Sequence, residues 1–134
     1  MASLGNYPAA AVLRAEDLVR ANKFYTDVLG LKPRDVPGPA GEGMNMFTAG
    51  DGTTVMVYER PGMPAPQNTS LGFGIPADTF DEVAADLRAR GVTFEDYDLP
   101  EIGLKTVNGV AEFEGFKAAW FKDSEGNIVN IASM

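Results

Sequence analysis

The feature that most constrains the fold is a pattern that occurs twice, about 60 residues apart. An apolar strand pattern is followed by a helical pattern that ends at a glycine, first over residues 10–31 and again over residues 71–92. Gly30 and Gly91 stand where a helix is commonly closed by a residue in the left-handed conformation. Because the same order returns in both halves, the sequence predicts two similar modules.

The predicted boundaries follow from this repeat. The segment RPGMPAPQNT carries three prolines and no periodicity, which is typical of a linker. We therefore expect module 1 at about residues 8–60, a linker at about 61–68 and module 2 at about 69–133. All 134 residues are expected to form a single domain, since the length is typical of one.

The first module begins with a strand at residues 10–15 and a helix at about 18–29, for which Asp17 is the predicted N-cap. A strand is expected at 31–36 and a loop at 37–43. The segments MNMFTAG and TTVMVYE flank the turn Gly50-Asp51-Gly52, which indicates a β-hairpin.

The second module begins with a strand in LGFGI, and a helix is expected to start at Asp78, with Asp81 close to a capping-box position. A strand is then predicted in VTFEDY and three more in GVAEFEG, FKAAWFKD and NIVNIAS, the last two joined by the turn DSEGN. The intervening residues 95–109 read as a long polar loop. Such a loop is either solvated or a lid that contacts ligand through Lys105 or Asp98.

Composition excludes several classes of function. The chain contains neither cysteine nor histidine, so disulfides, Ser-His-Asp triads and tetrahedral zinc sites are ruled out. A net charge of −8 disfavours binding to nucleic acid or to an anionic membrane surface. Neither a signal peptide nor an apolar run of the roughly 20 residues that span a bilayer is recognisable, and a cytoplasmic location is expected.

Three segments together resemble a known family. AEDLVRANKFYTDVLGL, FDEVAADLRARGVTF and AAWFKDSEGNIVNI are similar to the first helix unit, the second helix unit and the closing hairpin of the vicinal oxygen chelate superfamily. That superfamily includes glyoxalase I, extradiol dioxygenases, fosfomycin-modifying enzymes and bleomycin resistance proteins. The resemblance covers residues 8–133. It implies an α+β fold in which two βαβββ modules form a curved mixed sheet cup with the helices on the outside, and it implies a homodimer.

The resemblance also implies where metal ligands would stand. The three principal positions fall on Ala10, Ser70 and Asn130, and a fourth falls on Val57, with Glu59 as the nearest carboxylate. Iron, zinc and nickel sites need imidazole, carboxylate or thiolate donors, which this set lacks. We therefore expect no metal and no cofactor. The alternative is an oxygen-only magnesium or calcium site that uses Glu59, Glu112 or Glu114.

Alternation along the strands predicts which residues line the cup. Leu13, Leu71, Phe73, Ile75, Val129 and Ile131 should face the helices, whereas Ala10, Val12, Arg14, Ser70, Gly72, Gly74, Ile128 and Asn130 should face the cup. Phe121 is the better core candidate, so Trp120 should line the cup. The predicted ligand-binding residues are Trp120, Tyr58, Met56, Phe47, Met44, Gly72, Ser70, Phe116, Lys105 and Asn130. The competing interpretation is that the aromatic and methionine residues are ordinary core and that the glycines only relieve packing.

Three functions remain open. The first is a metal-free protein of the bleomycin-resistance type that sequesters an aromatic or glycopeptide natural product at a dimer interface, with an acidic surface that favours cations. The second is a glyoxalase-like lyase or dioxygenase-related enzyme that uses Glu59, Tyr58 or Lys105 as acid or base. The third is a regulatory domain that binds a macromolecular partner and no small ligand.

Overall fold

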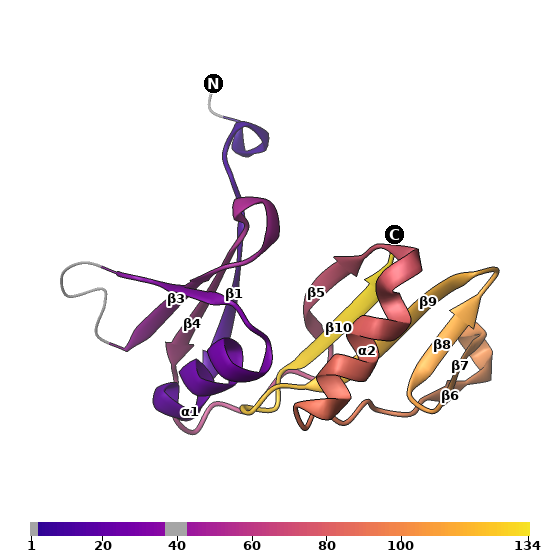
Figure 1. Ribbon diagram of the computed structural model, residues 1–134. Helices are drawn as coiled ribbons and strands as arrows, with labels where there is room; N and C mark the ends of the chain where they lie inside the picture. Colours follow the sequence, from indigo (N-terminus) through magenta and orange to yellow (C-terminus); the bar gives the residue numbers. More distant parts are fainter. Residues whose placement is uncertain (1–2, 37–42) are drawn as a thin grey trace. The chain divides into compact units, whose positions relative to one another are not determined.

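The computed structural model describes residues 3–36 and 43–134, so the loop predicted at 37–43 lies almost wholly outside the described residues (Figure 1). The chain forms two compact units, Met1–Met63 and Pro64–Met134. Each unit has one mixed sheet, and an α-helix packs on one face of it, which confirms the α+β class. No helix among the described residues is long and apolar enough to cross a membrane.

Unit 1 contains a four-stranded sheet in the order β1-β4-β3-β2, with β1 parallel to β4. Its elements are η1 (Leu4–Asn6), β1 (Ala10–Ala15), α1 (Leu18–Lys23), η2 (Phe24–Val28), β2 (Lys32–Arg34), β3 (Met44–Thr48), η4 (Gly50–Gly52) and β4 (Thr54–Glu59). The predicted hairpin is confirmed, because β3 and β4 pair antiparallel around the Gly50–Gly52 turn.

The helix of unit 1 begins as predicted and ends differently. The backbone N–H of Arg20 donates to the Asp17 carboxylate at 3.1 Å, which confirms the N-cap. The single helix expected at 18–29 is instead an α-helix to Lys23 followed by a wider π turn, in which the N–H of Leu29 donates to the carbonyl of Phe24. Gly30 then adopts a φ of 74°, as a helix-closing glycine does.

Unit 2 repeats this topology with extra strands. Its sheet has the order β5-β10-β9-β8-β7-β6, and β5 is parallel to β10 as β1 is to β4. The elements are β5 (Thr69–Ile75), η5 (Ala77–Thr79), α2 (Phe80–Ala89), β6 (Asp98–Leu99), η6 (Pro100–Ile102), β7 (Leu104–Val107), β8 (Val110–Phe113), β9 (Phe116–Lys122) and β10 (Ile128–Ser133). In both units the first and last strands therefore lie side by side.

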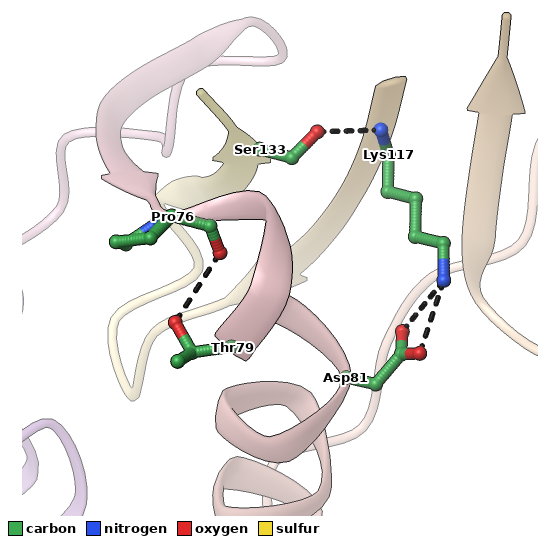
Figure 2. Close-up of polar contacts among 5 residues, drawn as sticks. All are labelled: Pro76, Thr79, Asp81, Lys117 and Ser133. Atoms are coloured by element: carbon green, nitrogen blue, oxygen red, sulfur yellow. Dashed lines mark hydrogen bonds and ion pairs between the residues drawn. The ribbon is translucent and has the colours of Figure 1, made fainter. Parts of the chain in front are cut away.

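The start of α2 corrects the capping-box prediction. The helix is preceded by the short turn η5, and within the described residues no side chain caps its first turn. Figure 2 shows that Asp81 instead accepts hydrogen bonds from the Lys117 ammonium group at 2.9 and 3.0 Å. The backbone N–H of Lys117 donates to the Ser133 hydroxyl, so one residue of β9 is bonded to both α2 and β10 (Figure 2).

The core of unit 2 lies between α2 and the sheet. The buried residues of α2 are Phe80, Ala84 and Leu87. Opposite them, Phe121, Val129 and Ile131 are at most 2% exposed. The assignment of Phe121 to the core is therefore confirmed.

The segment between α2 and β8 differs from both predictions made for it. Residues 92–97 contribute only a single bridge, between Phe94 and Phe121, and residues 98–107 form the hairpin β6–β7 rather than a loop. Thr106 organises this hairpin through its hydroxyl, which is buried with the residue. The hydroxyl accepts from the N–H of Tyr97 at 2.8 Å and donates to the Asp96 carboxylate at 2.9 Å, and that carboxylate also accepts from the N–H of Gly109.

Removing the Thr106 hydroxyl should destabilise the protein. Thr106→Val keeps the shape of the side chain but leaves the Tyr97 N–H and one Asp96 oxygen without that partner. We expect a loss of about 1–3 kcal/mol in the free energy of unfolding, measured by urea denaturation. Thr79→Val is the control, because the Thr79 hydroxyl makes its 3.2 Å bond to the Pro76 carbonyl at an exposed position. Equal losses in the two variants would contradict the role given to Thr106.

The Asp81–Lys117 pair should be visible in a titration. The hydrogen bond that Lys117 donates to Asp81, together with the charges of Asp81 and Glu112, raises the pKa of Lys117 above its usual value and outweighs the lowering by desolvation. Asp81→Asn should therefore lower the Lys117 pKa, measured by NMR of its ammonium nitrogen. The pair contributes stability below the ordinary lysine pKa of about 10.4, and that contribution disappears as the pH rises through the raised value.

Glu82→Gln provides the matched control for this titration. It removes an acidic charge from the same first turn of α2 but keeps the bond between Asp81 and Lys117. The Lys117 pKa should change little in this variant. An identical Lys117 pKa in the wild type and in Asp81→Asn would show that the ion pair does not form in solution.

Candidate functional site

A hollow of about 220 Å³ lies in unit 2. It is lined by residues from the linker, from five strands and from the segment before β6: Gln67, Asn68, Thr69, Tyr97, Leu99, Leu104, Trp120 and Ile128. The apolar residues come from strands β6, β7, β9 and β10, and the polar ones are three consecutive residues that enter β5. The hollow therefore combines an apolar wall with one polar edge.

Strand register explains why these residues meet. Trp120 of β9 lies opposite Asn130 of β10, whereas the adjacent Phe121 lies on the α2 side. Successive side chains of a strand point to opposite faces, so Trp120 and Leu104 lie on the face that α2 does not cover. Leu99 pairs with Leu104, which brings a second leucine to the same wall.

Two aromatic rings form the centre of the wall. The rings of Tyr97 and Trp120 meet edge to face, with their centroids 5.7 Å apart and their planes at 81°. The N–H of Glu95 donates to the Trp120 carbonyl at 2.7 Å, and the N–H of Tyr97 is held by Thr106. Backbone bonds on both sides of Tyr97 thus fix its ring against the tryptophan.

The lining residues carry no formal charge at neutral pH. None of those that the structure describes is Asp, Glu, Lys or Arg. Burial, and then the nearby charge of Glu95, raises the pKa of Tyr97, so its hydroxyl stays protonated. Glu95 itself lies 3.5 Å from the ammonium group of Lys122, which offsets its charge.

The space predicted above the strand glycines is filled by the chain itself. A Cβ atom on Gly72 would lie 2.5 Å from the Oδ1 atom of Asn130, and one on Gly74 would collide with the sulfur of Met134. These glycines are needed because side chains of this chain cross β5 at close range. The expectation that Gly72 makes room for a ligand is corrected accordingly, and Asn130 covers that position.

The other predicted residues of unit 2 lie outside the lining of the hollow. Lys105 pairs with Asp98 and points to the sheet face opposite to Leu104. Phe116 pairs with Phe113 at the exposed end of the β8–β9 hairpin. The Ser70 hydroxyl donates to the Asn68 carbonyl at 3.4 Å, beside the polar edge.

The predicted residues of unit 1 divide between two faces. Met44 lies opposite Tyr58, and Met56 lies opposite Val12, which is 58% exposed, so these four share the face that α1 leaves open. Phe47 is fully buried and stacks on Tyr25 of η2, with ring centroids 5.6 Å apart. The structure therefore corrects the assignment of Phe47 to a ligand wall and places it in the core.

Sequence reasoning missed most of the hollow outside Trp120 and Ile128. Leu99 and Leu104 lie in a segment with many charged residues. The sequence pattern there does not show that the two leucines share one face of a hairpin. Tyr97 was assigned to a strand and Gln67 and Asn68 to a linker. An apolar pair that flanks the turn Pro100–Gly103 is the one signal that could have indicated this wall.

The positions that correspond to metal ligands do not provide a transition-metal donor set. Ala10 has no donor atom, and Ser70 and Asn130 are neutral. Val57 is 1% exposed and belongs to the core, and the Glu59 carboxylate accepts from the N–H of Leu18 at the start of α1. Within residues 3–36 and 43–134 no three His, Cys, Asp or Glu side chains lie together in a way that could hold a metal ion.

The carboxylates of the alternative oxygen site lie in β4, in β8 and in the turn after β8. Glu112 of β8 lies opposite Lys117, which is bonded to Asp81 on α2. Glu114 stands in the β8–β9 turn with a φ of 48°, and Glu59 belongs to unit 1. Glu112 and Glu114 are both exposed, so neither contributes to an enclosed oxygen cage.

Comparison with known proteins gives consistent results. The family model described as Glyoxalase/Bleomycin resistance protein/Dioxygenase superfamily matches residues 8–131. A glyoxalase/dioxygenase from Nostoc punctiforme has a TM-score of 0.70 at 17% identity, covering 99% of this chain and 95% of the other. No curated protein matches the chain.

Two further solved structures share the fold. The fosfomycin resistance protein FosX from Listeria monocytogenes has a TM-score of 0.66 at 16% identity, over 96% of this chain and 90% of that chain. The oxidase ChaP-H2 has a TM-score of 0.66 at 22% identity, over 96% and 93%. With a family model that matches most of its length, this chain belongs to the glyoxalase/bleomycin resistance protein/dioxygenase superfamily.

Proposed function

We propose that this chain is a metal-free binding protein that sequesters an aromatic or glycopeptide natural product. The observation that carries the proposal is the Trp120–Tyr97 pair in the wall of the hollow. Small-molecule sites are typically concave and mostly apolar, with a few polar groups that fix orientation, and this hollow has that composition. Aromatic rings at its centre suit a planar ligand, because flat rings stack and meet edge to face.

The size of the hollow limits what it holds. Ligand pockets usually measure about 300–1,000 Å³, and this one measures about 220 Å³. It accommodates one ring system of a large natural product rather than all of it. We propose that the remainder lies in a groove completed by a second copy of the chain, as the resemblance to the bleomycin-resistance type implies. The open sheet face of Met44, Met56, Tyr58 and the exposed Val12 is apolar surface of the kind that such an interface buries.

The enzyme alternative rests on the relatives, which include proteins named as a fosfomycin resistance protein and an oxidase. Its three candidate acids or bases lie outside the hollow. Glu59 binds the N-terminus of α1, Tyr58 lies in unit 1, with the guanidinium of Arg60 5.8 Å from its ring centroid, and Lys105 faces away from Trp120. Among the described residues of the lining, the one titratable side chain is Tyr97, whose pKa is raised. Binding without transformation is therefore favoured.

Trp120 is the sole tryptophan and provides the test of binding. Its fluorescence should be titrated with bleomycin-type glycopeptides, mitomycin-like quinones, polycyclic aromatics and flavins. We expect saturable quenching by one class, because a planar ring enters beside the indole. Isothermal calorimetry with the responding compound should give the same dissociation constant and should show that the compound is recovered unchanged.

Two variants of strand β7 locate the binding to the hollow. Leu104→Glu places a charge in the apolar wall and should weaken binding by at least about tenfold, because an unpaired charge is costly to bury. Val107→Glu makes the matched change on the opposite face, at a side chain that is 68% exposed, and should change binding less than about twofold. Equal weakening by both variants, or no quenching by any class, would exclude the hollow as the binding site.

Metal binding should not return on single replacement at a family position. Ala10→His supplies one imidazole, but Ser70 and Asn130 remain weak donors, so dialysis against zinc or manganese should leave no stoichiometric ion on the variant. The unmodified chain serves as the control for surface binding. One ion bound tightly per variant chain would contradict the proposal and would favour the metal-dependent enzyme.

A further inference from the structure

We propose that the part of the ligand that enters the hollow is an uncharged planar ring whose edge carries both a hydrogen-bond donor and an acceptor, as in a lactam or an imide. This inference rests on the proposed binding function and names the chemistry that the hollow selects. It departs from the expectation that an acidic chain favours a cationic ligand.

The absence of charge from the lining is the first argument. The chain carries a net charge of −8, yet the lining residues among those described include no Asp, Glu, Lys or Arg. An ion that enters loses hydration and finds no counter-ion in the lining, which disfavours its binding. Charges elsewhere act weakly, because salt screens them beyond about 8 Å at physiological ionic strength.

Two charged residues next to lining residues also offset each other. Lys122 lies opposite the lining residue Ile128, and its ammonium group lies 3.5 Å from the Glu95 carboxylate. A cation over the Trp120 ring would gain a cation–π contact. However, that ring already meets the edge of Tyr97, and the described lining residues include no carboxylate that could balance the charge of the cation. A neutral ring gains the same aromatic contacts without the desolvation cost of an ion.

The polar edge is the second argument. Gln67, Asn68 and Thr69 are consecutive and exposed, and all three line the same hollow. A carboxamide offers both a donor and an acceptor, so it pairs with a ring edge that presents an N–H beside a C=O. Asn68 already donates one N–H of its carboxamide to the Thr69 carbonyl at 3.3 Å, so we assign Gln67 as the principal partner for that edge. Tyr97 also lines the hollow, and its hydroxyl stays protonated and uncharged.

Three bicyclic probes of similar size test this selection: quinolin-2-one, quinoline-2-carboxylate and N-methylquinolinium. They are respectively a neutral lactam, an anion and a cation. Quenching of Trp120 and calorimetry should show that the lactam binds at least about tenfold tighter than either ion, since burying an ion without a partner is unfavourable. The lactam affinity should not change with salt concentration, whereas binding of a cation through the net charge would weaken as salt rises.

Gln67→Leu separates recognition of the ring edge from stacking. The variant should lose about fivefold or more in affinity for quinolin-2-one, because a hydrogen bond to the carboxamide contributes about 1 kcal/mol. It should bind naphthalene, which has no such edge, as well as the unmodified chain does. Gln67 is exposed, so we expect the substitution to leave the fold intact, which circular dichroism should verify.

The possible outcomes distinguish this inference from the proposed function. Preference for the cation, or equal loss of lactam and naphthalene binding in Gln67→Leu, would overturn the inference while binding in the hollow stands. Binding of a natural product without binding of quinolin-2-one would also overturn it. If neither the probes nor any natural product binds, both the inference and the proposed binding function fail.

Discussion

The parallel pairing of first and last strands is the constraint on which the rest of each unit depends. β1 pairs with β4 and β5 pairs with β10, and a parallel pair needs a crossover that leaves one end of the sheet and returns to the other. In each unit the crossover contains the helix, so the helix packs on one face of the sheet. The opposite face is left uncovered by helix, and both candidate ligand surfaces lie on such faces. The topology thus determines which face of each sheet is open to a ligand. The side chains on that face then determine which ligand binds.

Hydrogen bonds of polar side chains then shape the site within that topology. The Thr106 hydroxyl and the Asp96 carboxylate turn a segment with many charged residues into a hairpin, because they supply partners for the N–H groups of Tyr97 and Gly109. The short bond from Arg88 on α2 to the Asn108 carbonyl ties the end of the same hairpin to the helix. The apolar wall of Leu99, Leu104 and Tyr97 is thus supported by hydrogen bonds of neighbouring polar side chains.

This division explains what the sequence could predict. Strand alternation and glycine positions are local, so the α+β class, the helix caps at Asp17 and Gly30 and the core position of Phe121 followed from them. Phe47 was misassigned because an aromatic residue in a strand reads the same whether it faces a helix or a ligand. Which face it occupies depends on the strand register, in which Phe47 lies opposite Val55 on the α1 side.

Glycine gave the least reliable functional signal for a physical reason. A glycine at position 72 indicates that another group approaches β5 closely, but the sequence does not distinguish a ligand from a neighbouring side chain. In the structure the neighbour is the side chain of Asn130. Asn130, the residue at a position where the resemblance implies a metal ligand, therefore packs across the strand. A carboxylate there would carry a charge that a metal ion balances, whereas a neutral amide leaves the uncovered face without that charge. The neutral amide at this position and the uncharged lining of the adjacent hollow therefore both support our proposal that this face of unit 2 binds neutral rings rather than ions.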